Sequence, residues 1–216
     1  MPNKPYVIKQ GDYLGKLAHQ LCFDAAEVWN DSANAELKQK RGDGSILCPG
    51  DVLFIPDEPP KTLPLTAKST NAYVAEVPKV KLELTLTEGD KPLADMPYRI
   101  EGIGDDSEKR TDGSGKVVIE APVNVREVML VLPKRGEKQL VRIGELDPVS
   151  EPSGARMRLT NLGLLGKGFA GADNYETSDA DRLRAGVQAF QRAQRLDPTG
   201  ELDEQTQAAL LAAHGS

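Results

Sequence analysis

Histidine, cysteine and aromatic residues are scarce in this sequence. Its 216 residues include two histidines and two cysteines, and aromatic residues make up 5% of the chain. These residues show neither the C-x-x-C nor the H-E-x-x-H spacing of a metal site, so the sequence predicts no metal and no cofactor. Two distant histidines cannot supply the ligand set of a zinc hydrolase, and no segment is long enough to build a two-carboxylate cleft. We therefore expect no catalytic residues and no enzymatic activity.

Long apolar runs and an excess of positive charge are also absent. No stretch approaches the ~20 apolar residues that cross a bilayer, so no membrane insertion is expected. The first six residues lack the apolar core of a secretory signal. This predicts synthesis in the cytoplasm, with delivery to the periplasm or cell wall only by a non-Sec route. The formal net charge of −6 argues against nucleic acid as a partner.

Two cysteines do not make a disulfide scaffold. We expect Cys22 and Cys48 to be separate thiols, with a bridge between them as the alternative. Few aromatic residues argue against one large core and favour several small ones. Proline-rich breaks divide the chain into residues 5–57, a linker at 58–78, residues 79–147 and residues 153–214. The predicted class is α+β with several domains.

The first piece has the pattern strand, helix, helix, strand, and a turn plus a short helix over 34–40 is expected before the last strand. A β-branched run begins at Tyr6, and apolar residues from Leu14 to Leu21 have helical spacing. Asp12 is the expected N-cap of that helix, and a second helix is expected from Asp24. The sole tryptophan, Trp29, lies on an apolar helical stripe. It is expected to anchor the core, with a sugar-stacking platform as the alternative.

The middle piece has the alternation of half-buried strands, and the last piece has helical spacing. Strands are expected at 80–86, 96–103, 117–119, 125–132 and 140–143, with a hairpin-type turn at 112–115. These short strands predict a small antiparallel sandwich. In the last piece a helix is expected from Met157 to Gly166, a second capped by Ser178 or Asp179, and a third capped by Asp203.

Residues 6–56 resemble a LysM domain, a βααβ glycan-binding module, through Gly11-Asp12-Tyr13-Leu14 and Pro49-Gly50-Asp51-Val52-Leu53-Phe54-Ile55-Pro56. The resemblance implies that peptidoglycan or a chitin-like glycan binds in a shallow groove between two loops. By position, the implied glycan-binding residues are Gly11, Asp12, Tyr13, Leu14, Ile46, Leu47, Pro49 and Gly50. Tyr13 replaces the usual Thr or Ser of the family, so it either stacks on a sugar ring or fills the groove.

Residues 156–211 resemble the three-helix peptidoglycan-binding domain of wall proteins, through Arg158-Leu159-Thr160-Asn161-Leu162-Gly163, Ala189-Phe190-Gln191-Arg192-Ala193 and Thr199-Gly200-Glu201-Leu202-Asp203. The middle piece is similar to Ig-like sandwiches through Pro92 to Tyr98 and Thr111 to Gly115. Together these resemblances imply a non-catalytic peptidoglycan-binding protein with two wall-binding modules. The alternative is an adaptor of a type VI secretion or phage-tail-like system, with a secretion-system or toxin protein as partner.

Overall fold

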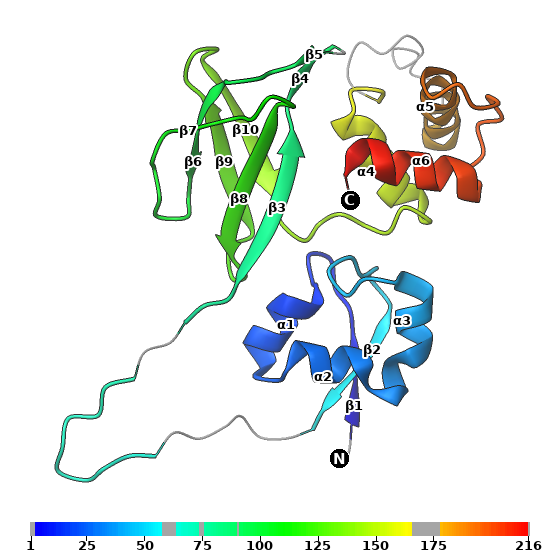
Figure 1. Cartoon of the computed structure of the whole chain (residues 1–216). Coiled ribbons are helices and arrows are strands. Elements are labelled where there is room, and N and C mark those ends of the chain that lie inside the picture. Colours follow the sequence, from blue (N-terminus) through cyan, green and yellow to red (C-terminus); the bar gives the residue numbers. More distant parts are fainter. Residues whose placement is uncertain (1–2, 58–63, 74–75, 90, 166–177, 216) are drawn as a thin grey trace. The chain divides into compact units, whose positions relative to one another are not determined.

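The computed structural model describes residues 3–57, 64–73, 76–89, 91–165 and 178–215 (Figure 1). Helices and antiparallel strands are both present, which confirms the α+β class. The chain divides into two compact units, residues 1–145 and 146–216. Within the described ranges, no helix is long and apolar enough to cross a membrane. The described part of the expected linker, residues 64–73, forms neither helix nor strand, and residues 58–63 and 74–75 lie outside the description.

The N-terminal module (residues 3–57) has the predicted element order, and the short helix expected over 34–40 is present at Ala35–Arg41. Its elements are β1 (Asn3–Val7), α1 (Leu14–Leu21), α2 (Ala25–Asn30), the 3-10 turn η1 (Ser32–Asn34), α3 (Ala35–Arg41) and β2 (Val52–Pro56). The two strands pair antiparallel, with Tyr6 opposite Leu53. The sequence predicts that the second helix starts at Asp24; it begins at Ala25, and Asp24 is its cap, because the Asp24 carboxylate accepts a hydrogen bond from the Glu27 N–H.

One apolar cluster holds the helices of this module against its strands. Trp29 is half-buried and packs against the cluster, as expected of a core anchor, whereas Leu21 is exposed despite its place in the helical pattern. The buried Asn34 amide donates to the carbonyls of Val28 and Phe54 and accepts from the Phe54 N–H. It thereby ties the helices to β2. The buried cluster consists of Ile8, Leu14, Leu17, Val28, Leu37, Leu47, Leu53 and Ile55.

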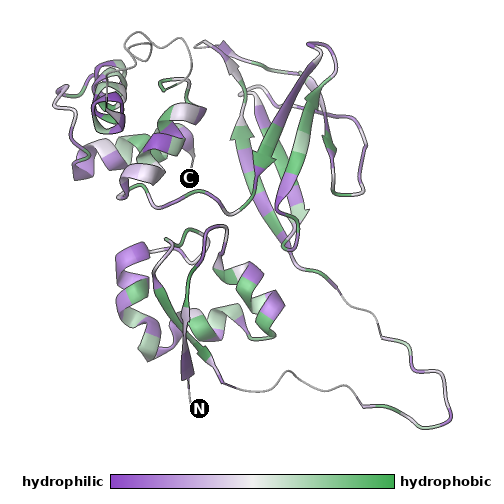
Figure 2. Cartoon of the chain, turned by 180° about the vertical axis from the view of Figure 1, so that it is seen from behind, coloured by the Kyte–Doolittle hydropathy of each residue, from purple (hydrophilic) through white to green (hydrophobic). Residues whose placement is uncertain are grey.

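The two-sheet region (residues 79–145) contains strands close to all the predicted positions. They are β3 (Lys79–Thr85), β4 (Thr87–Glu88), β5 (Lys91–Pro92), β6 (Pro97–Glu101), β7 (Lys109–Arg110), β8 (Lys116–Pro122), β9 (Glu127–Leu132) and β10 (Glu137–Arg142). One sheet pairs β3 with β8, and another has the order β10-β9-β6-β7. Hydrophobic and hydrophilic residues alternate along strands such as β3 (Figure 2), and both sheets contribute side chains to a single core.

The turn at residues 112–115 is not the hairpin turn that the sequence predicts. Asp112 stabilises a tight turn there, because its carboxylate accepts from the N–H groups of Ser114 and Lys116. The turn nevertheless joins β7 to β8, and these strands pair in different sheets. The sequence correctly predicts a turn at these residues. Long-range strand pairing decides which sheets the strands on either side of it join.

The C-terminal unit contains α4 (Pro152–Asn161), α5 (Asp179–Ala193) and α6 (Glu204–His214). Ser178 and Asp203 cap the last two helices as predicted. The first helix begins five residues before the expected Met157 and ends at Asn161, and the expected end at Gly166 lies outside the description. Pro152 explains the earlier start, since proline suits the first turn of a helix. The buried core consists of Ala155, Leu159, Val187, Phe190 and Leu210.

Candidate functional site

The two loops predicted to form a glycan groove lie next to each other at one end of the β1–β2 pair. The Leu14 N–H donates to the Gly44 carbonyl at 2.9 Å. Ile8, which follows β1, donates to the Asp51 carbonyl and accepts from the Gly50 N–H, both at 2.9 Å. These backbone bonds bring the predicted residues of both loops together.

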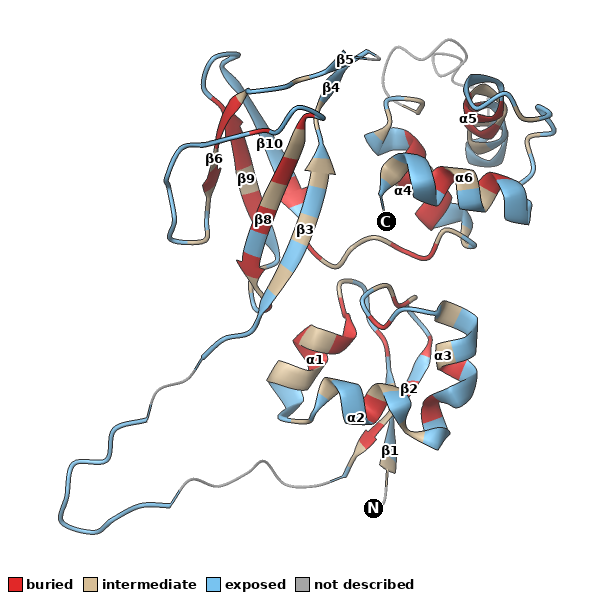
Figure 3. Ribbon diagram, in the orientation of Figure 1, coloured by how far each residue is buried: buried red, intermediate tan, exposed pale blue. Residues whose placement is uncertain are grey.

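Burial separates the eight predicted residues into two groups (Figure 3). The side chains of Asp12, Tyr13, Leu14 and Leu47 are buried, and Leu14 and Leu47 belong to the core of the N-terminal module. Gly11 and Ile46 are partly exposed, and Pro49 and Gly50 are exposed. The predicted residues that present surface are therefore Gly11, Ile46, Pro49 and Gly50.

Asp12 is the centre of a buried polar network rather than a helix cap. The N-cap position of α1 is Tyr13, which makes no side-chain cap bond. The Asp12 carboxylate accepts hydrogen bonds from the Tyr6 hydroxyl at 2.9 Å, the Lys9 N–H at 3.1 Å and the Lys16 ammonium at 3.0 Å. Although burial raises the pKa of Asp12, these donors outweigh it and hold the pKa below its ordinary value.

Lys16 also fixes the loop backbone, because its ammonium donates to the Gly11 carbonyl at 2.6 Å. The Lys16 and Asp12 side chains are each only 8% exposed, so this is a buried ion pair. Lys16 is not among the predicted site residues. A lysine four residues after an aspartate at a predicted helix start nevertheless indicates an ion pair. The network occupies the carbonyl of Gly11 and both oxygens of Asp12.

The second loop is held by a matching ion pair. The Asp51 carboxylate accepts from the Arg41 guanidinium at 2.8 and 2.9 Å and from the Cys48 N–H at 2.9 Å. Burial raises the pKa of Asp51, but the bonds from Arg41 and Cys48 lower it more, and the net direction is down. A forked pair of this kind fixes geometry as well as charge. Both sides of the predicted groove therefore rest on buried carboxylates.

Tyr13 is buried rather than exposed. Its side chain is 5% exposed and belongs to the core of the two-sheet region. Its hydroxyl donates to the Val123 carbonyl at 3.2 Å, and burial raises the pKa of this phenol. This placement is neither that of a ring stacked on a sugar nor that of a ring filling the groove, because Tyr13 is buried in the core of the two-sheet region.

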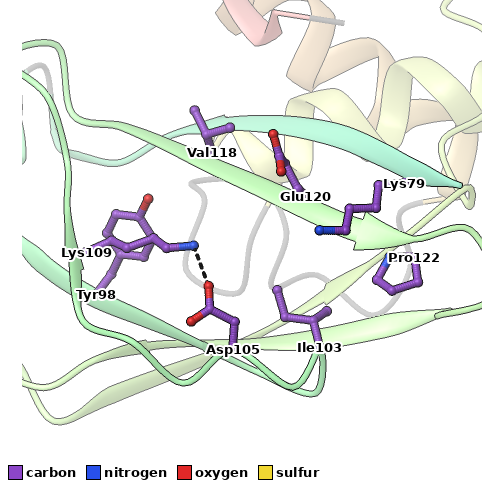
Figure 4. Close-up of a pocket in the computed structure, with 8 residues that line it drawn as sticks. All are labelled: Lys79, Tyr98, Ile103, Asp105, Lys109, Val118, Glu120 and Pro122. Atoms are coloured by element: carbon purple, nitrogen blue, oxygen red, sulfur yellow. Dashed lines mark hydrogen bonds and ion pairs between the residues drawn. The ribbon is translucent and has the colours of Figure 1, made fainter. Parts of the chain in front are cut away.

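A separate cleft of about 380 Å³ opens in the two-sheet region (Figure 4). Lys109 and Asp105 form an ion pair across it at 3.0 Å. Hydrogen bonds from Ser107 and Lys109 lower the pKa of Asp105 to about 2. Because positive and negative side chains are mixed, the cleft has no strong preference for one ligand charge. It is lined by Lys79, Tyr98, Ile103, Asp105, Lys109, Val118, Glu120 and Pro122.

Metal and disulfide chemistry find little support in the described ranges. There, no group of three or more His, Cys, Asp or Glu side chains is placed to hold a metal ion. Cys22 and Cys48 are not bridged to each other.

In the C-terminal unit, one buried glutamine organises the turn between α5 and α6. The Gln191 amide donates to the Thr199 hydroxyl, the Glu201 carbonyl and the Thr206 hydroxyl at 3.0–3.2 Å. Its carbonyl accepts from the Gly200 N–H at 2.9 Å. The side chain thus bonds four groups, and it holds the 199–206 segment to α5.

A buried arginine performs a similar task at α4. The Arg158 side chain is fully buried and donates to the carbonyls of Asp147 and Gly154 at 2.8 and 2.9 Å. Burial lowers its pKa to about 10. Gln191 and Arg158 both lie in segments on which the predicted resemblance rests, and both serve the fold rather than an exposed surface.

Residues 153–210 match the family model described as a putative peptidoglycan binding domain. The matched stretch begins inside α4 and ends inside α6, and it contains Arg158, Gln191 and the capped start of α6. This match confirms the resemblance of the C-terminal segment. A search of curated proteins and a search of solved structures found no match. The glycan-binding assignment of the N-terminal module stays a prediction.

Proposed function

We propose that this protein binds peptidoglycan without cleaving it and that residues 153–210 make the main contact. The family match of this segment carries the proposal. The N-terminal module is the proposed second binding module, for the N-acetylglucosamine-containing strand of peptidoglycan or a chitin-like glycan. Two modules in one chain raise the effective concentration of the second binding event.

The partly exposed rim of the N-terminal module suits a neutral, acetamido-rich ligand. Ile46 and Pro49 offer apolar surface to acetamide methyl groups, and the glycines at 11 and 50 allow close approach of the backbone. The net charge of −6 gives no general attraction to an anionic wall. We therefore expect binding that changes little with salt concentration.

A sedimentation assay tests this function. The full chain is incubated with insoluble peptidoglycan at low and high salt, the suspension is centrifuged, and the protein in the pellet is measured. The chain is expected in the pellet at both salt concentrations, with no release of soluble muropeptides. Failure of the full chain to sediment would contradict wall binding, and released muropeptides would contradict a non-catalytic role.

Two glutamine variants locate the contact. Gln191→Leu removes the side chain that holds the 199–206 segment, while Gln194→Leu changes an exposed glutamine three residues later. The first variant is expected to sediment less than the wild type, and the second is expected to sediment equally. Equal sedimentation of both variants would contradict the proposal that residues 153–210 make the main contact with peptidoglycan.

A second candidate function is an adaptor of a type VI secretion or phage-tail-like contractile system. It rests on the resemblance stated for the sequence; the Tyr13 contact lies within this chain and does not bear on an external partner. An affinity pull-down of the tagged full chain from native cytoplasm tests this candidate. A stoichiometric secretion-system or toxin protein, bound with sub-micromolar affinity, is the expected result for an adaptor. Recovery of the full chain alone would contradict it.

A further inference from the structure

Tyr13 comes from the N-terminal module but packs with the two-sheet region. Its ring shares a buried cluster with side chains such as Ile143 and Val123, whereas its neighbour Leu14 packs into the module's own core. The hydroxyl of Tyr13 bonds the Val123 carbonyl, 110 positions along the chain. Two adjacent residues of one loop are therefore buried in two different cores.

The surface that receives Tyr13 is built around a glycine. Gly144 has a φ of +79°, and a Cβ added there would lie 2.6 and 2.9 Å from two carbon atoms of the Tyr13 ring. The same Cβ would lie 3.2 Å from the Gly11 carbonyl oxygen. Next to it, the Gln10 amide donates to the Glu145 carbonyl at 3.3 Å. Residues 10–13 thus lie directly against the backbone at 144–145.

We infer that Tyr13 is a closing device: it docks the first loop of the proposed glycan groove onto the two-sheet region, and the groove takes a β-linked N-acetylglucosamine oligomer only after this contact opens. The inference rests on the proposed function of the N-terminal module. In the proposed groove, a sugar would contact the loop surface formed by Gly11 to Leu14. The backbone at Gly144 lies against this loop, so the sugar and the two-sheet region would compete for the same surface. The apparent affinity is therefore the affinity of the open form reduced by the fraction of open molecules.

The main test variant changes Gly144, the residue of the two-sheet region that contacts the Tyr13 ring. Gly144→Ala places a methyl group where the Tyr13 ring lies and leaves every residue of the proposed groove unchanged. Gly136→Ala is the matched control, because Gly136 also has a positive φ, of +65°, but a Cβ there meets nothing within 4 Å. Any effect of left-handed backbone strain alone appears in both variants.

Two independent measurements separate docking from binding in the full chain. Amide hydrogen exchange at residues 10–14 and 143–145 reports docking. Titration with an N-acetylglucosamine hexamer, followed by calorimetry and by the fluorescence of Trp29, reports binding at the N-terminal module. The sole tryptophan lies in this module, so its signal is local.

Gly144→Ala is expected to lose exchange protection at residues 10–14 and to bind the hexamer at least about tenfold more tightly than the wild type and Gly136→Ala. Tyr13→Thr, which removes the ring from the other side, is expected to give the same gain and serves if Gly144→Ala misfolds. Lost protection with unchanged affinity, lost protection with no binding at all, or an unprotected loop in the wild type would each overturn the closing device. Sedimentation through residues 153–210 does not depend on this contact, so failure of the device and failure of wall binding are distinguishable.

Discussion

At the scale of single residues, buried polar side chains hold the loops of this protein in place. Asp12 and Lys16 form an ion pair of which each side chain is 8% exposed, and Tyr6 adds a third partner. Removing one member of a buried pair leaves the other charge without compensation, which costs more than the pair itself contributes. The same reasoning applies to Asp51 and Arg41 in the second loop.

The N-terminal module should lose stability in acid. The pKa values of Asp12 and Asp51 are lowered in the folded chain from an ordinary value of 3.8. Below about pH 4 the unfolded chain takes up protons that the folded chain resists, so the free energy of unfolding falls as the pH drops further. Urea unfolding followed by Trp29 fluorescence between about pH 3 and pH 7 measures how the free energy of unfolding depends on pH.

Asp12→Asn is expected to flatten part of that acid dependence and to lower the free energy of unfolding at neutral pH by about 1–3 kcal/mol. Asp57→Asn is the control, since Asp57 forms an exposed pair with Lys4 and exposed pairs contribute little. An acid slope in Asp12→Asn as steep as in the wild type would show that this carboxylate is not the responsible group.

Gln191 has a comparable stabilising role in the C-terminal unit, where it bonds the 199–206 segment. Gln191→Leu leaves buried partners such as Thr206 without their bonds, and we expect a loss of roughly 2–4 kcal/mol in the free energy of unfolding of that unit. Gln194→Leu, at the exposed C-cap position of α5, should change it by less than about 0.5 kcal/mol. Thermal unfolding followed by circular dichroism provides the comparison. Similar losses in the two variants would refute the role of Gln191.

At the scale of elements, the first turn of α4 depends on a glycine that the helical pattern does not require. A Cβ at Gly154 would overlap the Pro148 carbonyl oxygen and lie 2.5 Å from that of Asp147. Both obstacles are backbone atoms, which cannot rotate away as a side chain can. The close approach also places these carbonyls beside Arg158, which bonds the Asp147 carbonyl.

Gly154→Ala should therefore lower the free energy of unfolding, whereas Gly→Ala within a helix usually raises it. Within a helix this change normally stabilises by about 1 kcal/mol, but here the overlap should destabilise the C-terminal unit by at least about 2 kcal/mol. Gly186→Ala in α5 is the comparison, because the nearest described atoms to its Cβ belong to the movable Leu165 side chain. A smaller loss at Gly154 than at Gly186, in chemical denaturation of the two variants, would contradict the packing argument.

At the scale of the whole molecule, the chain consists of two compact units with separate buried clusters. Trp29 lies in the first unit, and all three helices of the second unit lie beyond it in sequence. Fluorescence therefore reports the unfolding of the N-terminal module in the first unit, while helical circular dichroism reports both units. Comparing the two signals separates the first unit from the second.

We expect the two units to unfold separately. Gln191→Leu should shift the transition followed by circular dichroism and leave the transition followed by Trp29 unchanged. Asp12→Asn should shift the Trp29 transition. Parallel shifts of both probes in both variants would instead show a single cooperative unit.

Local patterns predicted the elements well where neighbours in sequence decide them. The sequence predicts a helix start at Asp24 and caps at Ser178 or Asp179 and at Asp203. The structure has caps at Asp24, Ser178 and Asp203, where a short side chain bonds an N–H three residues ahead. The alternation along β3 was equally readable. Asp12 has the same residue type as two of these caps, but distant donors claim its carboxylate, and so the cap prediction there was wrong.

The sequence by itself determined the α+β class, the element order and the peptidoglycan-binding segment, because hydrophobic spacing, capping residues and motifs are local properties of the chain. Only the tertiary structure decided that the turn at 112–115 joins two sheets and that Tyr13 packs beside Gly144, far along the chain. Such contacts depend on which surfaces meet after folding. A tyrosine that can stack on a sugar and one that fills a core are identical in sequence, and burial alone separates them.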